Sequence, residues 1–338
     1  MHDRTISHRQ LLTVVFLALF PLGTEVLFSR LATAGAAGWL CPILAGVMAV
    51  ILAAGLGRRG LSLSQGRIHR VLAGVLLLWG LCFGGAQACR IGVRLSDPLG
   101  ASPVVLTASL LILAGWMAAG GLAAFARACE IFLLALGSAT ALILLGGAFR
   151  LHWDWVLLWT PRELSRVPLG GLETLGLLAV GCYSLFLIKD VTPEKGSLGR
   201  TCRLIGRICL LLGAVGALIL GRFGPALTGT MDRPFFQMVS GLGLEGAFQR
   251  LEQLASALWA LGDLALLGFL LLCLVRLTGH VTGRQEKPAW AWTLAAAVFL
   301  LALPVPLWQR VLEGSVLWVG NLAAGGLILA VFAAKKKK

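Results

Sequence analysis

The sequence predicts an all-α integral membrane protein with about ten transmembrane helices. The chain of 338 residues is 58% hydrophobic and only 13% charged, whereas a soluble domain carries about 25% charged residues. Its mean hydropathy is +0.88. Apolar runs long enough to cross a bilayer, about 20 residues each, recur along the whole sequence. These observations exclude a soluble globular protein.

The apolar segments are separated by gaps that are too short to hold a soluble domain. We therefore expect one polytopic membrane domain over residues 1–338, with a short cytoplasmic N-terminus at 1–9 and a lysine-rich cytoplasmic tail at 335–338. The expected spans are residues 10–29, 37–57, 69–91, 102–121, 127–149, 169–188, 203–222, 252–277, 289–308 and 315–334.

The positions of Lys and Arg predict the orientation, because short cytoplasmic loops are enriched in these residues. If the N-terminus is cytoplasmic, 19 of the 29 Lys and Arg residues fall on the cytoplasmic side. This bias predicts cytoplasmic N- and C-termini and an even number of spans. It also accounts for the net charge of +14 without a nucleic-acid partner, because the basic residues punctuate the apolar runs.

The beginning of the chain has some features of a secretory signal peptide, namely a basic start followed by an apolar run. Glu25 and Arg30 interrupt that pattern, and further apolar segments follow. We therefore expect the first segment to remain as an uncleaved transmembrane helix.

The first segment is interrupted in its middle by Pro21, Gly23, Thr24 and Glu25. Proline removes a backbone donor and clashes with the preceding turn, and glycine tolerates unwinding. Unwound backbone at membrane depth persists only against protein or a water-filled cavity. The pattern therefore favours an unwound turn beside a cavity, with a plain proline kink as the alternative.

The sixth segment is interrupted in a similar way at Gly181, which Cys182 and Tyr183 follow. Ten spans divide into two halves of five, so segments 1 and 6 occupy corresponding positions in halves of opposite topology. Paired interruptions of this kind point to the binding site of an inverted-repeat transporter. We expect five residues to face one pocket near the middle of the membrane: Gly23, Thr24, Glu25, Gly181 and Tyr183.

All of these residues except Gly181 also have a structural alternative. The amides of Gly23 and Thr24 favour a ligand carboxylate at a half-helix N-terminus, or else small residues there permit close helix packing. The hydroxyl of Tyr183 bonds a ligand or a core partner.

The two acidic residues inside the apolar segments are costly at that depth, which makes each a candidate functional group. Glu25 can bind a ligand ammonium, take up a proton, or pair with Arg90 or Arg94. Asp263, in segment 8, is a candidate for an ion or proton site, with hydrogen bonding between helices as its alternative.

No pattern in the sequence indicates catalysis or a cofactor. The eight cysteines contain no C-x-x-C pair, which disfavours a zinc or redox site and favours small buried side chains. No nucleophile–base pair, phosphate-binding loop or metal-ligand cluster stands out. We expect no enzyme activity, no cofactor and no metal.

Two stretches of the chain resemble the B-subunit family of spore germinant receptors, also called spore germination permeases. The first is Ile6-Ser7-His8-Arg9-Gln10-Leu11, followed by Gly23-Thr24. The second is Pro234-Phe235-Phe236-Gln237-Met238, followed by Arg250-Leu251-Glu252 and Ala257-Leu258-Trp259-Ala260-Leu261-Gly262. The resemblance spans roughly residues 6–330, and the chain departs from the family's usual pattern at Glu25 and at Cys182-Tyr183.

The resemblance implies a fold, a ligand and partners. The family is related to the amino acid–polyamine–organocation transporter superfamily, so the implied fold is a LeuT-like inverted repeat of five plus five helices, with helices 1 and 6 broken. The implied ligand is a small germinant, often an amino acid, held where these two helices are interrupted. The implied partners are an A-type membrane subunit and a C-type lipoprotein, in the spore inner membrane.

Two other functions remain open at this point. One is a secondary transporter of amino acids or amines that is coupled to H⁺ or Na⁺. The other is a structural membrane subunit with a vestigial cavity.

Overall fold

A computed structural model describes residues 5–57, 67–149, 151–192, 197–241, 251–305, 307–308 and 315–333. Within these ranges the regular structure is helical, and the β-pairing is limited to an isolated parallel bridge between Ile6 and Val191. The lysine-rich tail at 335–338 and Arg250 lie outside the described residues.

The long helices follow the ten expected segments in order. They are α1 (His8–Val26), α3 (Leu40–Gly57), α4 (Arg67–Leu99), α5 (Pro103–Ala119), α6 (Leu122–Ala148), α9 (Val167–Leu178), α10 (Ser197–Thr230), α12 (Leu251–Thr282), α13 (Ala289–Ala302) and α15 (Val316–Ala333). Shorter elements join them, namely α2 (Phe28–Leu31), η1 (Ala32–Ala37), α7 (Asp154–Leu157), α8 (Pro161–Leu164), η2 (Ala179–Asp190) and α11 (Pro234–Ser240).

Most of these helices are long and apolar enough to cross a membrane. Among the described residues six helical stretches meet that standard, one of which, Pro161–Asp190, consists of α8, α9 and η2. α3 meets it together with the preceding segment, to which it is bent by 101°. Three further apolar helices are shorter, α5, α13 and α15. The span expected at 289–308 ends early, at Ala302, because Pro304 cannot continue the helical hydrogen bonding.

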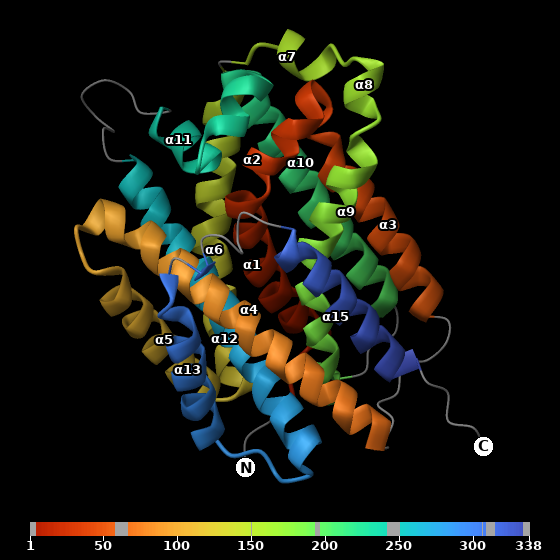
Figure 1. Cartoon of the computed structure of the whole chain (residues 1–338), viewed down its shortest axis with the longest axis vertical. Helices are drawn as coiled ribbons and strands as arrows, with labels where there is room; N and C mark the ends of the chain where they lie inside the picture. The colour runs from red at the N-terminus through yellow and green to blue at the C-terminus, as the bar shows by residue number, and fades with distance from the viewer. Residues whose placement is uncertain are drawn as a thin grey trace.

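The helices form a bundle in which α1 and α12 are central (Figure 1). In the α12 span 72% of the residues are buried and in α1 67%, against 28% in α6. α1 packs against α12, α6 and α10. Figure 1 shows α7, α8 and α11 together at one end of the bundle. Large apolar side chains exposed on the outside, such as Ile51, Ile131 and Leu142, suit a lipid environment.

The start of α1 is fixed by a capping box, which explains part of the opening sequence motif. The Ser7 hydroxyl accepts a hydrogen bond from the Gln10 amide at 3.2 Å, and the Gln10 side chain accepts one from the Ser7 amide at 3.0 Å. Two donors that a helix start leaves unpaired are thereby satisfied.

The first span is interrupted later than the sequence predicts. α1 is helical through Pro21, Gly23 and Thr24 and ends at Val26, with a bend at Leu27 before α2 begins. The expectation of unwound backbone at Gly23 and Thr24 is therefore wrong. The physical reason is that local partners hold the turn closed: Thr24 donates to the Pro21 carbonyl at 2.8 Å, and the Leu27 amide donates to the Gly23 carbonyl at 3.2 Å.

The sixth span changes helix type close to the predicted interruption. The α-helix α9 ends at Leu178, and the chain continues as the 3₁₀-helix η2 from Ala179 to Asp190. A 3₁₀ stretch of this length is uncommon and often marks a functional hinge. Gly181 lies two residues after the change.

Candidate functional site

The site is built where α1 meets α12, at a contact that requires glycine. A Cβ atom on Gly262 would lie only 2.3 Å from Cγ of Pro21, so the proline ring of α1 lies directly on the α12 backbone. One turn further along each helix, the Trp259 indole N–H donates to the Thr24 hydroxyl at 2.8 Å. This close approach places the acidic residues of the two helices near each other.

Helical spacing explains why these residues meet. Pro21, Thr24 and Glu25 are spaced i, i+3, i+4 and therefore share one face of α1. On α12 the same spacing puts Trp259, Gly262 and Asp263 on one face. The two faces pack against each other.

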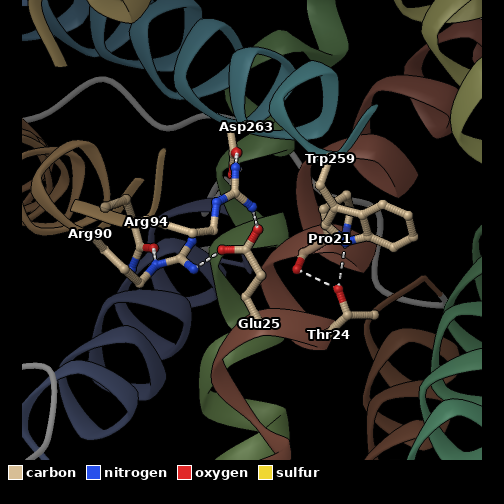
Figure 2. A network of polar contacts seen from close by, with 8 residues as sticks. Pro21, Thr24, Glu25, Arg90, Arg94, Trp259 and Asp263 are labelled. Atoms are coloured by element: carbon tan, nitrogen blue, oxygen red, sulfur yellow. Dashed lines mark hydrogen bonds and ion pairs between the residues drawn. The ribbon is translucent and has the colours of Figure 1, made fainter. Parts of the chain in front are cut away.

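Four charged side chains form a buried network at this contact, and Figure 2 shows them converging from three helices. Glu25 pairs with both Arg90 and Arg94 of α4, and Arg94 also pairs with Asp263 of α12. The side chains of Glu25, Arg94 and Asp263 are only 3%, 4% and 2% exposed, and that of Arg90 is 16% exposed. Two cations and two carboxylates therefore neutralise one another inside the protein.

Burial makes each of these charges dependent on the others. Removing an ion from water costs several kcal/mol, which only good pairing and additional hydrogen bonds repay. Deleting one member leaves an uncompensated buried charge, at a typical cost of about 3–5 kcal/mol. The network therefore ties α1, α4 and α12 together.

The network also presents hydrogen-bond donors with no partner among the described residues. These buried atoms are Nε2 of Gln87, Nη2 of Arg90 and Nε of Arg94. Gln87 is held in place by the Arg90 Nε–H, which donates to its side-chain oxygen at 2.8 Å. An unpaired buried donor costs about 1–3 kcal/mol, so an anionic group that accepts from these donors is favoured here.

Aromatic side chains cover the network on one side. Phe235 and Phe236 of α11 pack against Trp259, with ring centroids 4.6 and 6.5 Å away. The Arg94 guanidinium carbon lies 5.2 Å from the centroid of the Phe236 ring, within the range of a cation–π interaction. The site thus combines charged groups with an apolar wall.

The structure brings together only some of the predicted site residues. Thr24 and Glu25 lie at the α1–α12 contact, as does Asp263. Gly23 points to another helix: a Cβ there would lie 2.8 Å from the Leu212 side chain of α10. Positions 23 and 25 differ by about 200° around a helix, so these two residues cannot face one pocket from a helical α1.

Gly181 and Tyr183 also make contacts away from the network. A Cβ on Gly181 would lie 2.9 Å from the Leu19 side chain of α1, so Gly181 permits close packing between η2 and α1. The Tyr183 hydroxyl is buried and donates to the Leu76 carbonyl of α4 at 2.9 Å. This is the core partner given as its alternative, and a ligand role for these two residues stays a prediction.

Sequence reasoning missed three contributors to the site. Gln87 lies on the same face of α4 as Arg90 and Arg94, at positions i, i+3 and i+7, and this polar spacing inside an apolar span was a usable signal. Phe235 and Phe236 gave no such signal, because only the fold brings α11 over Trp259.

Comparison with solved structures relates the fold to a known architecture. The chain is similar to the crystal structure of MhsT in complex with L-phenylalanine, with a TM-score of 0.70 and 15% sequence identity, over 97% of this chain and 89% of that one. No protein-family model matches the chain, and no curated protein matches it in sequence. The structural likeness establishes a LeuT-like membrane fold.

Proposed function

We propose that this protein binds an amino acid at the Glu25–Arg90–Arg94–Asp263 network and serves as the germinant-binding membrane subunit of a spore germinant receptor. The observation that carries the binding proposal is the network itself, with its two carboxylates, two guanidinium groups and three unpartnered donors. An amino acid is a zwitterion whose two charges match the two kinds of charge present here.

The ligand would enter by exchanging ion pairs. Its carboxylate would accept from Arg90 and Gln87, in the bidentate geometry that guanidinium groups favour. Its ammonium would donate to Glu25 or Asp263. Because each charge that is displaced gains a new partner, binding leaves no ion uncompensated inside the protein.

The adjacent aromatic wall would take the ligand side chain. The Phe236 ring already lies against the Arg94 guanidinium group and packs against the Trp259 indole. An apolar or aromatic amino acid buries its side chain most favourably against such a surface. The MhsT structure, whose ligand is L-phenylalanine, supports an amino acid as the ligand class for this fold.

A signalling role follows from the ion pairs between helices that ligand binding would break. Glu25, Arg94 and Asp263 connect α1, α4 and α12 in the free protein. A ligand that binds better to the state with these pairs opened shifts the population toward that state. The receptor assignment also rests on the sequence resemblance described above, which implies an A-type subunit and a C-type lipoprotein as the partners that receive the signal.

Proton-coupled transport is the second candidate, favoured by the two buried carboxylates. Glu25 and Asp263 lie inside spans, where acidic residues commonly serve as proton relays. Sodium coupling has less support, because Na⁺ sites in such folds use carbonyls of unwound helix. Here the Gly23 carbonyl accepts from Leu27, and the Pro21 carbonyl accepts from Thr24.

Ligand binding by the purified protein tests the proposal directly. We would screen the common L-amino acids by thermal shift and then measure Kd by calorimetry for the chain and for Arg90→Gln, with Arg127→Gln on the exposed face of α6 as the matched control. We expect Arg90→Gln to weaken binding by about tenfold or more, the scale of a hydrogen bond to a charged group. No amino-acid binding, or equal Kd in both variants, would refute the site.

Co-expression and transport assays separate the two functions. A germinant-receptor subunit should co-purify with an A-type membrane subunit and a C-type lipoprotein expressed beside it. A transporter should accumulate labelled amino acid in vesicles under a proton gradient. Uptake by the chain alone, without stable association with either partner, would contradict the receptor assignment.

A further inference from the structure

A second charged cluster lies at the opposite end of the spans, on the membrane face where α1 begins. His280 is in the last turn of α12, and Lys189 is in the last turn of η2. His69 and Arg70 lie in the first turn of α4. α12 packs against both α4 and η2, so these three helix ends converge.

The side chains of the cluster interact with one another. Lys189, Arg70 and His69 all lie close enough to His280 to interact electrostatically with its imidazole ring. The Nε2 atom of His280 is buried and has no hydrogen-bond partner among the described residues. A buried ring nitrogen without a partner costs free energy, and here basic groups of two neighbouring elements, α4 and η2, lie around it.

Two acidic residues beside the cluster, Asp190 and Glu286, are paired with another arginine. Arg276, one turn before His280 on α12, pairs with Asp190 and with Glu286. Lys189 and Arg70 are exposed and keep their positive charge available. The cluster therefore favours an anion.

Apolar side chains beside the cluster indicate what kind of anion fits. Ile68 and Val71 flank the two basic residues of α4 and are 74% and 67% exposed, and Ile188 precedes Lys189 and is 42% exposed. At the end of a transmembrane span such side chains contact acyl chains, while the adjacent basic groups lie at headgroup level. A soluble phosphate would use the charges but not this apolar rim.

We infer that His280, Lys189, Arg70 and His69 bind the phosphate of an anionic lipid headgroup between α4, η2 and α12. Basic pockets between transmembrane helices are known places for such headgroups, and each Lys or Arg contributes about 1 kcal/mol near an anionic membrane surface. The site is independent of the amino-acid site, because it shares no residue with it.

Native mass spectrometry of the detergent-purified chain tests the inference with phosphatidylglycerol as the probe and phosphatidylcholine as the neutral lipid. The variant is Arg70→Gln/Lys189→Gln, and the matched control is Lys287→Gln, which removes an exposed charge from the loop after α12. We expect the chain to retain phosphatidylglycerol in preference to phosphatidylcholine. The double variant should lose about thirtyfold in affinity for it, from two basic residues at the scale given above, while the control keeps it.

Inorganic phosphate provides the second arm of the experiment. If the lipid is the ligand, inorganic phosphate at about 10 mM should leave phosphatidylglycerol binding unchanged. Competition by inorganic phosphate would assign the site to soluble phosphate groups and overturn the lipid proposal. Equal retention of phosphatidylglycerol by the double variant and the control would overturn the site itself. His280→Gln, which keeps roughly the volume of the side chain, checks that result with a single substitution.

Discussion

At the residue scale, the protein depends on charges that are buried in pairs. Each carboxylate oxygen of Glu25 pairs with an arginine, and Arg94 pairs with two carboxylates. Such a network is more useful for holding helices in register and for exchanging partners than for stability alone, because apolar packing of equal volume often stabilises as well or better. Single substitutions inside it therefore have large and distinguishable effects.

Glu25→Gln keeps the volume and removes the charge, leaving Arg90 and Arg94 short of one negative partner. We expect the free energy of unfolding to fall by about 3–5 kcal/mol, measured by thermal or denaturant unfolding in detergent. If Glu25 also contacts the ligand ammonium, amino-acid affinity per folded molecule should weaken by about 1.5–3 kcal/mol.

The matched control is Glu130→Gln on the exposed face of α6, which should change neither quantity. Lower stability with unchanged ligand affinity would make Glu25 a purely structural ion pair. Unchanged stability would contradict the pairing seen in the structure.

Trp259→Phe removes the indole N–H that donates to Thr24 and leaves a gap beside Phe235. Trp259 is fully buried, so we expect a loss of about 1–3 kcal/mol in unfolding free energy from the deleted volume and hydrogen bond. Thermal unfolding of the variant measures it. Trp116→Phe, at a position 68% exposed, is the control and should shift stability by no more than about 0.5 kcal/mol.

At the element scale, the α1–α12 contact decides where the charged residues lie. The Pro21 ring fits against α12 only because residue 262 is glycine. Proline inside a helix is costly, and here its ring occupies space that a side chain on α12 would otherwise need. Pro21, which the sequence suggests would weaken α1, therefore makes a close packing contact between two central helices.

Gly262→Ala should separate these two helices. The added Cβ would lie 2.3 Å from the rigid Pro21 ring, so we expect a loss of about 1–3 kcal/mol, the usual cost of overpacking, together with weaker ligand binding. Gly206→Ala is the control, because a Cβ there meets nothing within 4 Å. A Gly262→Ala variant as stable as the control would show that α1 and α12 are not in tight contact.

At the scale of the whole molecule, the apolar helices and the LeuT-like fold make the protein an integral membrane protein, and the orientation remains a prediction from the positive charges. The expected outside loops are Trp153–Arg166 and Gly224–Glu245, and the expected inside loop is Asp190–Arg200. α7, α8 and α11 would then lie on the outside.

Cysteine labelling of intact cells with an impermeant maleimide checks this topology. We expect Thr160→Cys and Thr230→Cys to be labelled and Gly199→Cys to be protected until the membrane is permeabilised, since all three positions are exposed. The unsubstituted chain reports the labelling of its native cysteines. The opposite result at any two positions would contradict the ten-span topology.

The sequence by itself determined the class of protein and the order of its spans, because a long apolar run that can cross a bilayer as a helix is encoded locally. It also located the interruption near Gly181, since the residues that end a helix lie at its end. Glu25 and Asp263 were recognisable as candidates because acidic residues are costly at membrane depth.

Only the tertiary structure decided what those residues contact. The sequence left Glu25 with a ligand, a proton or an arginine as partners, and the fold pairs it with Arg90 and Arg94, which lie 65 and 69 residues away. It also decided that Gly23 packs against Leu212 instead of unwinding. The physical reason is that a local pattern fixes the face of a helix on which a residue lies, whereas the neighbour on that face depends on how distant helices pack.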